Sequence, residues 1–175
     1  MRTTLFPDAV ITGELLEHLR IPGVERYELV EGRIEILTPT NRQHAEMVAR
    51  LAALLGQRPG WHVLVGDPGL YIRRRPDTVR GPDVILISDD LYRQTDPARA
   101  FLTVAPELVV EVMSPSNETE QIAVKVREYL ALGSRVLVID VEAKVLQLAT
   151  AEGLTAVKTV ELPNGATLAH AELFV

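Results

Sequence analysis

The sequence predicts an α/β fold in which a central mixed β-sheet is flanked by helices. Three largely apolar runs, at residues 84–87, 108–113 and 136–139, have the length of buried strands. Segments with helical spacing of apolar residues lie before and after them, at 40–55 and from 118 or 119 to 132. Strands that are apolar along their whole length need cover on both faces, so we expect a helix on each side of the sheet.

Length and composition indicate one globular domain spanning residues 1–175. Of the 175 residues, 47% are hydrophobic and 24% are charged, as in typical globular domains. The absence of cysteine excludes disulfides, thiolate metal sites and a thiol nucleophile. A net charge of −6 argues against a protein that coats DNA through a basic face. We find no targeting or membrane segment, and we expect a cytoplasmic location.

Turn and capping residues predict the remaining elements. Thr12 is a candidate N-cap for a helix over 11–20, and Glu31-Gly32 fits the turn of an extra N-terminal hairpin with strands at 26–30 and 33–37. Thr40 and Gln43 have the spacing of a capping box for the helix that ends at Leu55. We also expect strands at 61–65 and 70–73 around Asp67-Pro68-Gly69, a strand over 135–140, and short C-terminal strands over 144–175 with turns at 152–153 and 164–165.

Glu111 is the most informative residue because it lies inside the apolar strand 108–113. Burying a carboxylate costs several kcal/mol unless a cationic partner, a proton or a metal ion compensates. The strand is followed at once by Ser114-Pro115-Ser116, which places Glu111 near the carboxyl end of a strand, where open α/β sheets usually form sites. A structural ion pair and a functional site are both consistent with this position.

Asp83 and Lys125 are the candidates that complete a site with Glu111. Asp83 follows Pro82 and enters the apolar strand at 84–87, so two acids from neighbouring strands can converge on one cation. Taken alone, an aspartate after proline is more often a turn residue. Lys125 flanks the apolar stripe of its helix and can bring its ammonium group to the sheet, although this position also suits a lysine exposed at the surface.

These residues resemble the PD-(D/E)XK nuclease superfamily and, within it, the Uma-type restriction endonuclease family. The most specific match is the block Pro106-Glu107-Leu108-Val109-Val110-Glu111-Val112-Met113-Ser114-Pro115-Ser116. Tyr27 to Gly32, His44, Pro82-Asp83-Val84, Lys125 and the closing segment from Leu162 to Phe174 also match, in the same order. The resemblance implies a restriction-endonuclease-like core of helix, three strands, helix and strand.

The resemblance further implies metal-dependent hydrolysis of phosphodiester bonds in DNA. Asp83 and Glu111 would bind Mg²⁺, for which Mn²⁺ is a substitute, and Lys125 would orient or activate the attacking water. His44 and Glu28 match positions that the family tends to keep, which makes them second-rank catalytic candidates. A homodimer, with two sites for two strands, is a further expectation from the family.

One position departs from the superfamily motif, and one segment departs from the family pattern. Met113 occupies the lysine position of the superfamily motif, so the lysine is expected from the following helix. Gly133-Ser134-Arg135 lacks the Glu and Trp usual in the family before the last core strand. Together with the acidic charge, this suggests a catalytically silent module that binds nucleic acid or a protein. Residues 73–75, Arg-Arg-Arg, fit either a phosphate-binding run or a solvated strand end.

Overall fold

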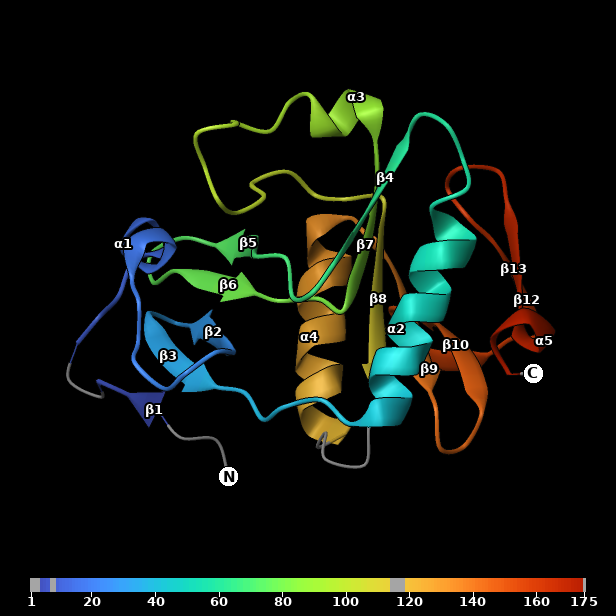
Figure 1. Ribbon diagram of the computed structural model, residues 1–175, viewed down its shortest axis with the longest axis horizontal. Helices are drawn as coiled ribbons and strands as arrows, with labels where there is room; N and C mark the ends of the chain where they lie inside the picture. Colours follow the sequence, from blue (N-terminus) through green and yellow to red (C-terminus); the bar gives the residue numbers. More distant parts are fainter. Residues whose placement is uncertain (1–3, 7–8, 114–118, 175) are drawn as a thin grey trace.

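Two β-sheets of six and five strands lie side by side, with helices covering both faces of the larger one, and a two-stranded ribbon follows at the C-terminal end (Figure 1). The structure is a computed structural model that describes residues 4–6, 9–113 and 119–174. Three groups of buried apolar residues form the core, one on each face of the larger sheet and one within the N-terminal part. The expectation of an α/β fold with a central mixed sheet is confirmed, because the larger sheet combines antiparallel pairs with one parallel pair.

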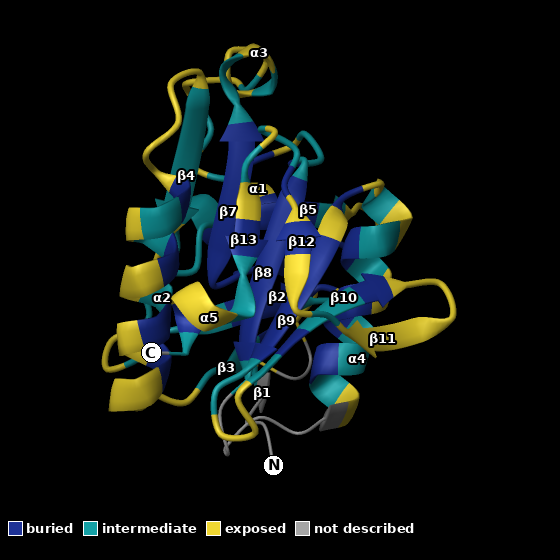
Figure 2. Ribbon diagram, turned by 90° about the vertical axis from the view of Figure 1, so that its right-hand side faces the viewer, coloured by how far each residue is buried: buried dark blue, intermediate teal, exposed yellow. Residues whose placement is uncertain are grey.

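The larger sheet has six strands in the order β11-β10-β9-β8-β7-β4. Its strands are β4 (Trp61–Val65), β7 (Val84–Ser88), β8 (Leu108–Met113), β9 (Arg135–Asp140), β10 (Val145–Thr150) and β11 (Gly153–Ala156). The central strands β7, β8 and β9 are buried along most of their length (Figure 2). Strands β8 and β9 run parallel, and the crossover between them contains α4 (Thr119–Leu132), as parallel pairing requires.

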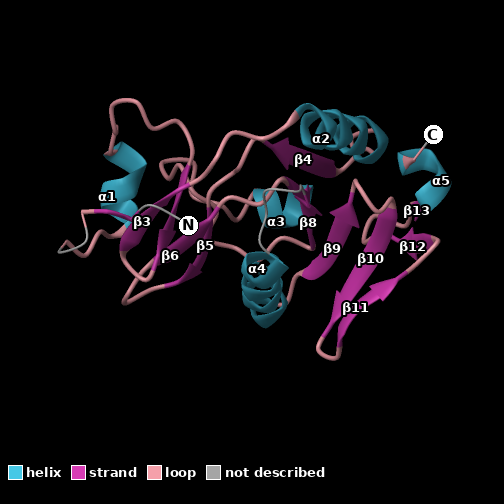
Figure 3. Ribbon diagram, turned by 90° about the horizontal axis from the view of Figure 1, so that it is seen from below, coloured by secondary structure: helices cyan, strands magenta, loops and turns pink. Residues whose placement is uncertain are grey.

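Two long helices cover opposite faces of this sheet (Figure 3). Helix α2 (Arg42–Leu55) packs on one face through Met47, Leu51 and Leu55. Helix α4 packs on the other through Ile122, Val126 and Tyr129. Successive strand residues alternate between the faces, so Val110 and Val112 point towards α2 while Val109 points towards α4. Glu111 therefore belongs to the α4 face.

The smaller sheet has five strands in the order β1-β3-β2-β6-β5. They are β1 (Thr4–Leu5), β2 (Tyr27–Val30), β3 (Arg33–Ile36), β5 (Leu70–Arg73) and β6 (Thr78–Arg80), with α1 (Gly13–His18) packed beside them. The predicted hairpin is confirmed, since Glu31 and Gly32 both have positive φ, as a two-residue type I′ turn requires. The hairpin does not stand alone as an extra element, because β2 also pairs with β6.

The strands on either side of Asp67-Pro68-Gly69 belong to different sheets. The strands predicted at 61–65 and 70–73 are confirmed as β4 and β5. They do not pair with each other, since β4 pairs with β7 and β5 pairs with β6. Gly66 and Asp67 both have positive φ, and Arg26 binds the Asp67 carboxylate. This turn carries the chain from one sheet to the other instead of folding it back.

The C-terminal segment forms a two-stranded ribbon and a short helix beside α2. Strands β12 (Thr159–Glu161) and β13 (Thr167–Ala169) pair, and α5 (His170–Leu173) follows. Leu162, Leu168 and Leu173 join the same core as α2, which confirms short C-terminal strands with a turn at 164–165. A further short helix, α3 (Asp89–Tyr92), follows β7. None of the helices in the described residues has both the length and the apolar character needed to cross a membrane.

Helix capping agrees with the sequence at α1 and differs at α2. The Thr12 hydroxyl accepts a hydrogen bond from the backbone N–H of Leu15, which confirms this N-cap, although the helix is shorter than the predicted 11–20. The N-cap of α2 is Asn41 and not Thr40, because Asn41 Oδ1 accepts from the backbone N–H of His44 at 2.9 Å. The two residues are adjacent and both are good caps, so sequence alone does not separate them.

The corrected cap gives a direct test. Asn41→Ala removes the acceptor for the first turn of α2, and we expect it to lower the free energy of unfolding by about 1 kcal/mol. Thr40→Ala is the matched control and should change stability by less than about 0.5 kcal/mol. Urea unfolding followed by circular dichroism measures both. Equal losses in the two variants would contradict the assignment of Asn41.

Candidate active site

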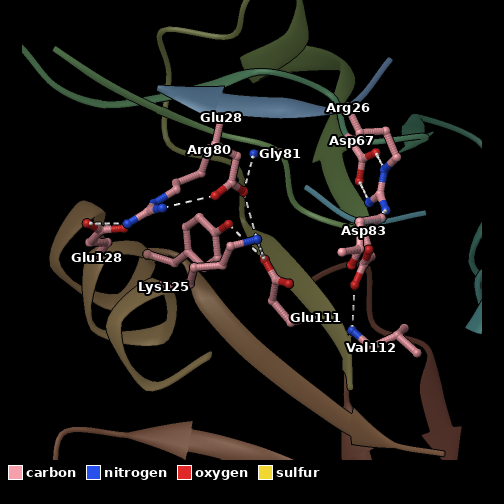
Figure 4. Close-up of polar contacts among 12 residues, drawn as sticks. Arg26, Glu28, Asp67, Arg80, Gly81, Asp83, Glu111, Val112, Lys125 and Glu128 are labelled. Carbon is pink, nitrogen blue, oxygen red and sulfur yellow. Dashed lines mark hydrogen bonds and ion pairs between the residues drawn. The ribbon is translucent and has the colours of Figure 1, made fainter. Parts of the chain in front are cut away.

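Asp83 and Glu111 are brought together by the pairing of β7 with β8. Val84 pairs with Val110 in this antiparallel ladder. Continuing the register by one residue places Asp83 opposite Glu111. The Asp83 carboxylate is fixed to β8, since its Oδ2 accepts from the backbone N–H of Val112 at 2.7 Å (Figure 4). Both acids are buried, with 6% of Asp83 and 2% of Glu111 exposed. The strands thus place two carboxylates side by side at the end of the sheet.

Lys125 and Tyr129 reach Glu111 from α4. They lie one helical turn apart and therefore on one face of the helix. The Tyr129 hydroxyl donates to Glu111 Oε1 at 2.8 Å, and Lys125 Nζ lies 3.4 Å from the same oxygen. The lysine is buried, so its ammonium group faces the sheet and not solvent. Met113, at the strand position where the superfamily motif has lysine, is half-buried on the same face as Glu111. The lysine near Glu111 comes instead from α4.

Glu28 is the closest partner of Lys125. Its Oε1 lies 2.7 Å from Lys125 Nζ and accepts from the backbone N–H of Gly81 at 3.1 Å. Its Oε2 accepts from Arg80 Nη1 at 2.9 Å. The Arg80 guanidinium also forms two bonds to Glu128 of α4, at 2.7 and 3.1 Å. The Glu28 carboxylate, which is 1% exposed, therefore accepts from donors on β6, on the segment before β7 and on α4.

His44 and Arg26 complete the surroundings of Asp83. His44 Nε2, from the first turn of α2, lies 3.0 Å from Asp83 Oδ1. Arg26 binds both oxygens of Asp67, at 2.6 and 2.8 Å, beside Asp83 (Figure 4). A pocket of about 320 Å³ opens between α2 and the end of β4 and is lined by His44 and Asp83 among others. Asp83 is therefore reached from the α2 side of the sheet.

The environment shifts the pKa values of the two glutamates in opposite directions. For Glu28, burial opposes ionisation, but Lys125 and Arg80 outweigh it and lower the pKa to about 2. For Glu111, burial dominates; Asp83 and Glu28 add to it, while Lys125 opposes it, and the pKa rises to about 8. Burial also works against the Lys125 ammonium, but Glu111 and Glu28 raise its pKa above the ordinary value. Lys125 is thus shared by two carboxylates, and its Nζ lies closer to Glu28 than to Glu111.

The five residues singled out in the sequence all reach this region. Glu28, Lys125 and Glu111 form one connected group. Asp83 lies beside it through its bond to the backbone N–H of Val112, and His44 contacts Asp83. Ser114, Pro115 and Ser116 lie outside the described residues. Of the arginines at 73–75, Arg73 pairs with Glu31 and Arg74 with Glu14, which fits a solvated strand end better than a phosphate site.

Arg80 and Tyr129 are the contacts that sequence analysis missed. Arginine is rarely buried, and a single arginine two residues before Pro82 gives no sign that it binds Glu28 and Glu128. Tyr129 lies on the apolar stripe of α4 and reads as a core residue. Its spacing of four from Lys125 was the available signal.

The comparison with protein families identifies the chain. Residues 14–175 match the Uma2 family, described as "Putative restriction endonuclease". The chain belongs to this family. The Uma2 match covers every residue of the group around Glu111, and it confirms the resemblance stated from the motif block.

A solved structure supports the same fold for this Uma2 protein. It is similar to the crystal structure of "a putative nuclease belonging to DUF820" from Anabaena variabilis, with a TM-score of 0.70. The likeness covers 94% of this chain and 97% of the other, at 14% sequence identity. At that identity the likeness shows the fold alone. None of the curated proteins matches the chain.

Arg80 provides a test of the buried network. Arg80→Met leaves Glu128 without its bidentate partner and Glu28 with one cation fewer, and we expect a loss of about 3 kcal/mol or more in unfolding free energy. Arg42→Met breaks an exposed ion pair with Glu46 and should cost less than about 0.5 kcal/mol. Chemical denaturation compares the two. A loss for Arg80→Met no larger than the control would contradict the network.

The raised pKa of Glu111 predicts a pH dependence of stability. The folded protein keeps a proton on Glu111 between pH 4.5 and about 8, while the unfolded chain loses it. This contribution to stability is complete below the unfolded value and is lost as the pH rises through the folded value. Glu111→Gln removes the titration, so the variant should gain stability relative to the parent as the pH rises through this window. Urea unfolding in the presence of a chelator measures the difference, and a pH-independent difference would refute it.

Proposed function

We propose that the protein is a metal-dependent nuclease that hydrolyses phosphodiester bonds in DNA. Membership of a family described as "Putative restriction endonuclease" supports the reaction class. The observation that carries the assignment to residues is the group of Asp83 and Glu111 at neighbouring strand positions, with Lys125 Nζ 3.4 Å from Glu111. Two acids and a lysine at one sheet end are suited to binding a cation and a phosphate.

The acids fit a magnesium ion. Among the described residues, no three His, Cys, Asp or Glu side chains gather closely enough to hold a metal between them. Mg²⁺ commonly uses one or two carboxylates and fills its remaining positions with water and substrate phosphate, so Asp83 and Glu111 suffice. Mn²⁺ accepts the same oxygen ligands. When bound, the ion supplies charge neutralisation at the phosphate and a lowered pKa for water.

The protein groups have separate tasks in this proposal. The backbone N–H of Val112 and the side chain of His44 fix the orientation of the Asp83 carboxylate. Tyr129 orients Glu111. Lys125, which its acidic partners keep charged, contributes a positive charge and donors near the attacking water. Glu28 is a positioning residue, since its short bond sets where the Lys125 ammonium lies.

Cleavage of plasmid and single-stranded DNA tests the proposal. With Mg²⁺ or Mn²⁺ the parent protein should cut DNA, and Asp83→Asn, Glu111→Gln and Lys125→Ala should each lose at least about 100-fold in rate. Asp89→Asn is the matched control, because Asp89 pairs with His62 in an exposed site, and it should cleave like the parent. Unchanged cleavage in any of the three site variants would refute its assignment.

Metal binding separates the nuclease from a silent module with the same fold. Calorimetry with DNA present should show Mg²⁺ binding that Glu111→Gln abolishes. No binding by the parent would favour a catalytically silent module that binds nucleic acid or a protein. A homodimer, in which two sites cut two strands, is part of the proposal and is measured by light scattering.

A further inference from the structure

The pocket beside Asp83 has no role in the group around Lys125. It has a volume of about 320 Å³ and lies on the α2 side of the sheet. Its lining residues include the small side chains Ala45 and Ala49 of α2 and Val65 at the end of β4, together with the polar side chains His44, Asp67 and Asp83. This volume is at the lower end of small-molecule sites and suits one planar ring system.

The charges lining the pocket disfavour an anion. Asp67 and Asp83 contribute two carboxylates, and the one guanidinium among the lining residues, Arg26, is already bound to both oxygens of Asp67. A phosphate group would therefore meet a net negative lining. A neutral ring with apolar faces and a polar edge is complementary to a lining that combines alanine and valine side chains with polar groups.

We propose that this pocket binds an unpaired base of the DNA strand next to the phosphodiester bond that Asp83 faces. The inference rests on the proposed nuclease function, because it is that function which brings a nucleotide to Asp83. A base inside a duplex is stacked and paired, and bringing it into a pocket costs least when the strand is already single. The substrate class that follows is DNA with an unpaired nucleotide at the cleavage point.

Two alanines on the same helix provide a matched pair of variants. Ala49 lines the pocket, whereas Ala53, one turn further along α2, is not among its lining residues; both are exposed. Leucine is a good helix former at either position, so neither change should unfold the protein. Ala49→Leu fills part of the pocket, and Ala53→Leu adds the same side chain outside it.

The experiment measures binding of a fluorescein-labelled single-stranded oligonucleotide of mixed sequence by anisotropy in the Glu111→Gln protein, which is not expected to cleave it. The duplex form and an abasic form of the same oligonucleotide are compared. We expect the single strand to bind about tenfold more tightly than the duplex, and Ala49→Leu to weaken single-strand binding by about tenfold. Ala53→Leu should stay within about twofold, and the abasic strand should not distinguish the variants.

The outcomes separate this inference from the proposed function. Tighter binding of the duplex, equal binding by the two leucine variants, or no binding of single strands would overturn the base pocket. Binding that depends on the base and is weakened by Ala49→Leu supports the pocket, whether or not the parent protein cleaves DNA. Absence of cleavage by the parent would refute only the nuclease function. Cleavage by the parent with no effect of Ala49→Leu on binding would refute the pocket alone.

Discussion

The buried charge of Glu28 fixes the position of the site. Its carboxylate accepts bonds from Arg80, from Lys125 and from the backbone N–H of Gly81. Transferring such an ion from water costs several kcal/mol, which only close donors recover. Because these donors belong to β6, to α4 and to the segment that leads to Asp83, satisfying Glu28 also sets the smaller sheet against the larger one.

The two glutamates that contact Lys125 differ in how strongly the protein favours their ionised form. Glu28, with two cations and a backbone donor, stays ionised, whereas Glu111 keeps a raised pKa because burial exceeds the help from one shared lysine. Groups whose surroundings push their pKa values apart usually perform different tasks. Glu28 stabilises the arrangement, whereas the negative charge of Glu111 is only partly compensated by the protein. This difference is consistent with the proposal that Glu111 binds a cation.

The sequence predicted the parts of the fold that depend on local pattern. The apolar strands, the helices around His44 and Lys125, and the Glu31-Gly32 turn follow from periodicity and turn chemistry, and Glu111 stands out as an acid in an apolar strand. The smaller sheet was not predicted, because β6 has three residues and its partner β2 lies about fifty positions earlier. Arg80 was missed for the same reason: its buried role depends on acids brought from distant segments.

The separation in sequence of the groups around Glu28 has a consequence for how the chain folds. Glu28 and Arg80 are 52 positions apart, and closing such long loops is slow compared with forming hairpins or helices. The hairpin of β2 and β3 and the helix that carries Lys125 can form early with their charged side chains still hydrated. These charges lose their hydration when the two sheets pack together, so we expect the site to form among the last steps of folding.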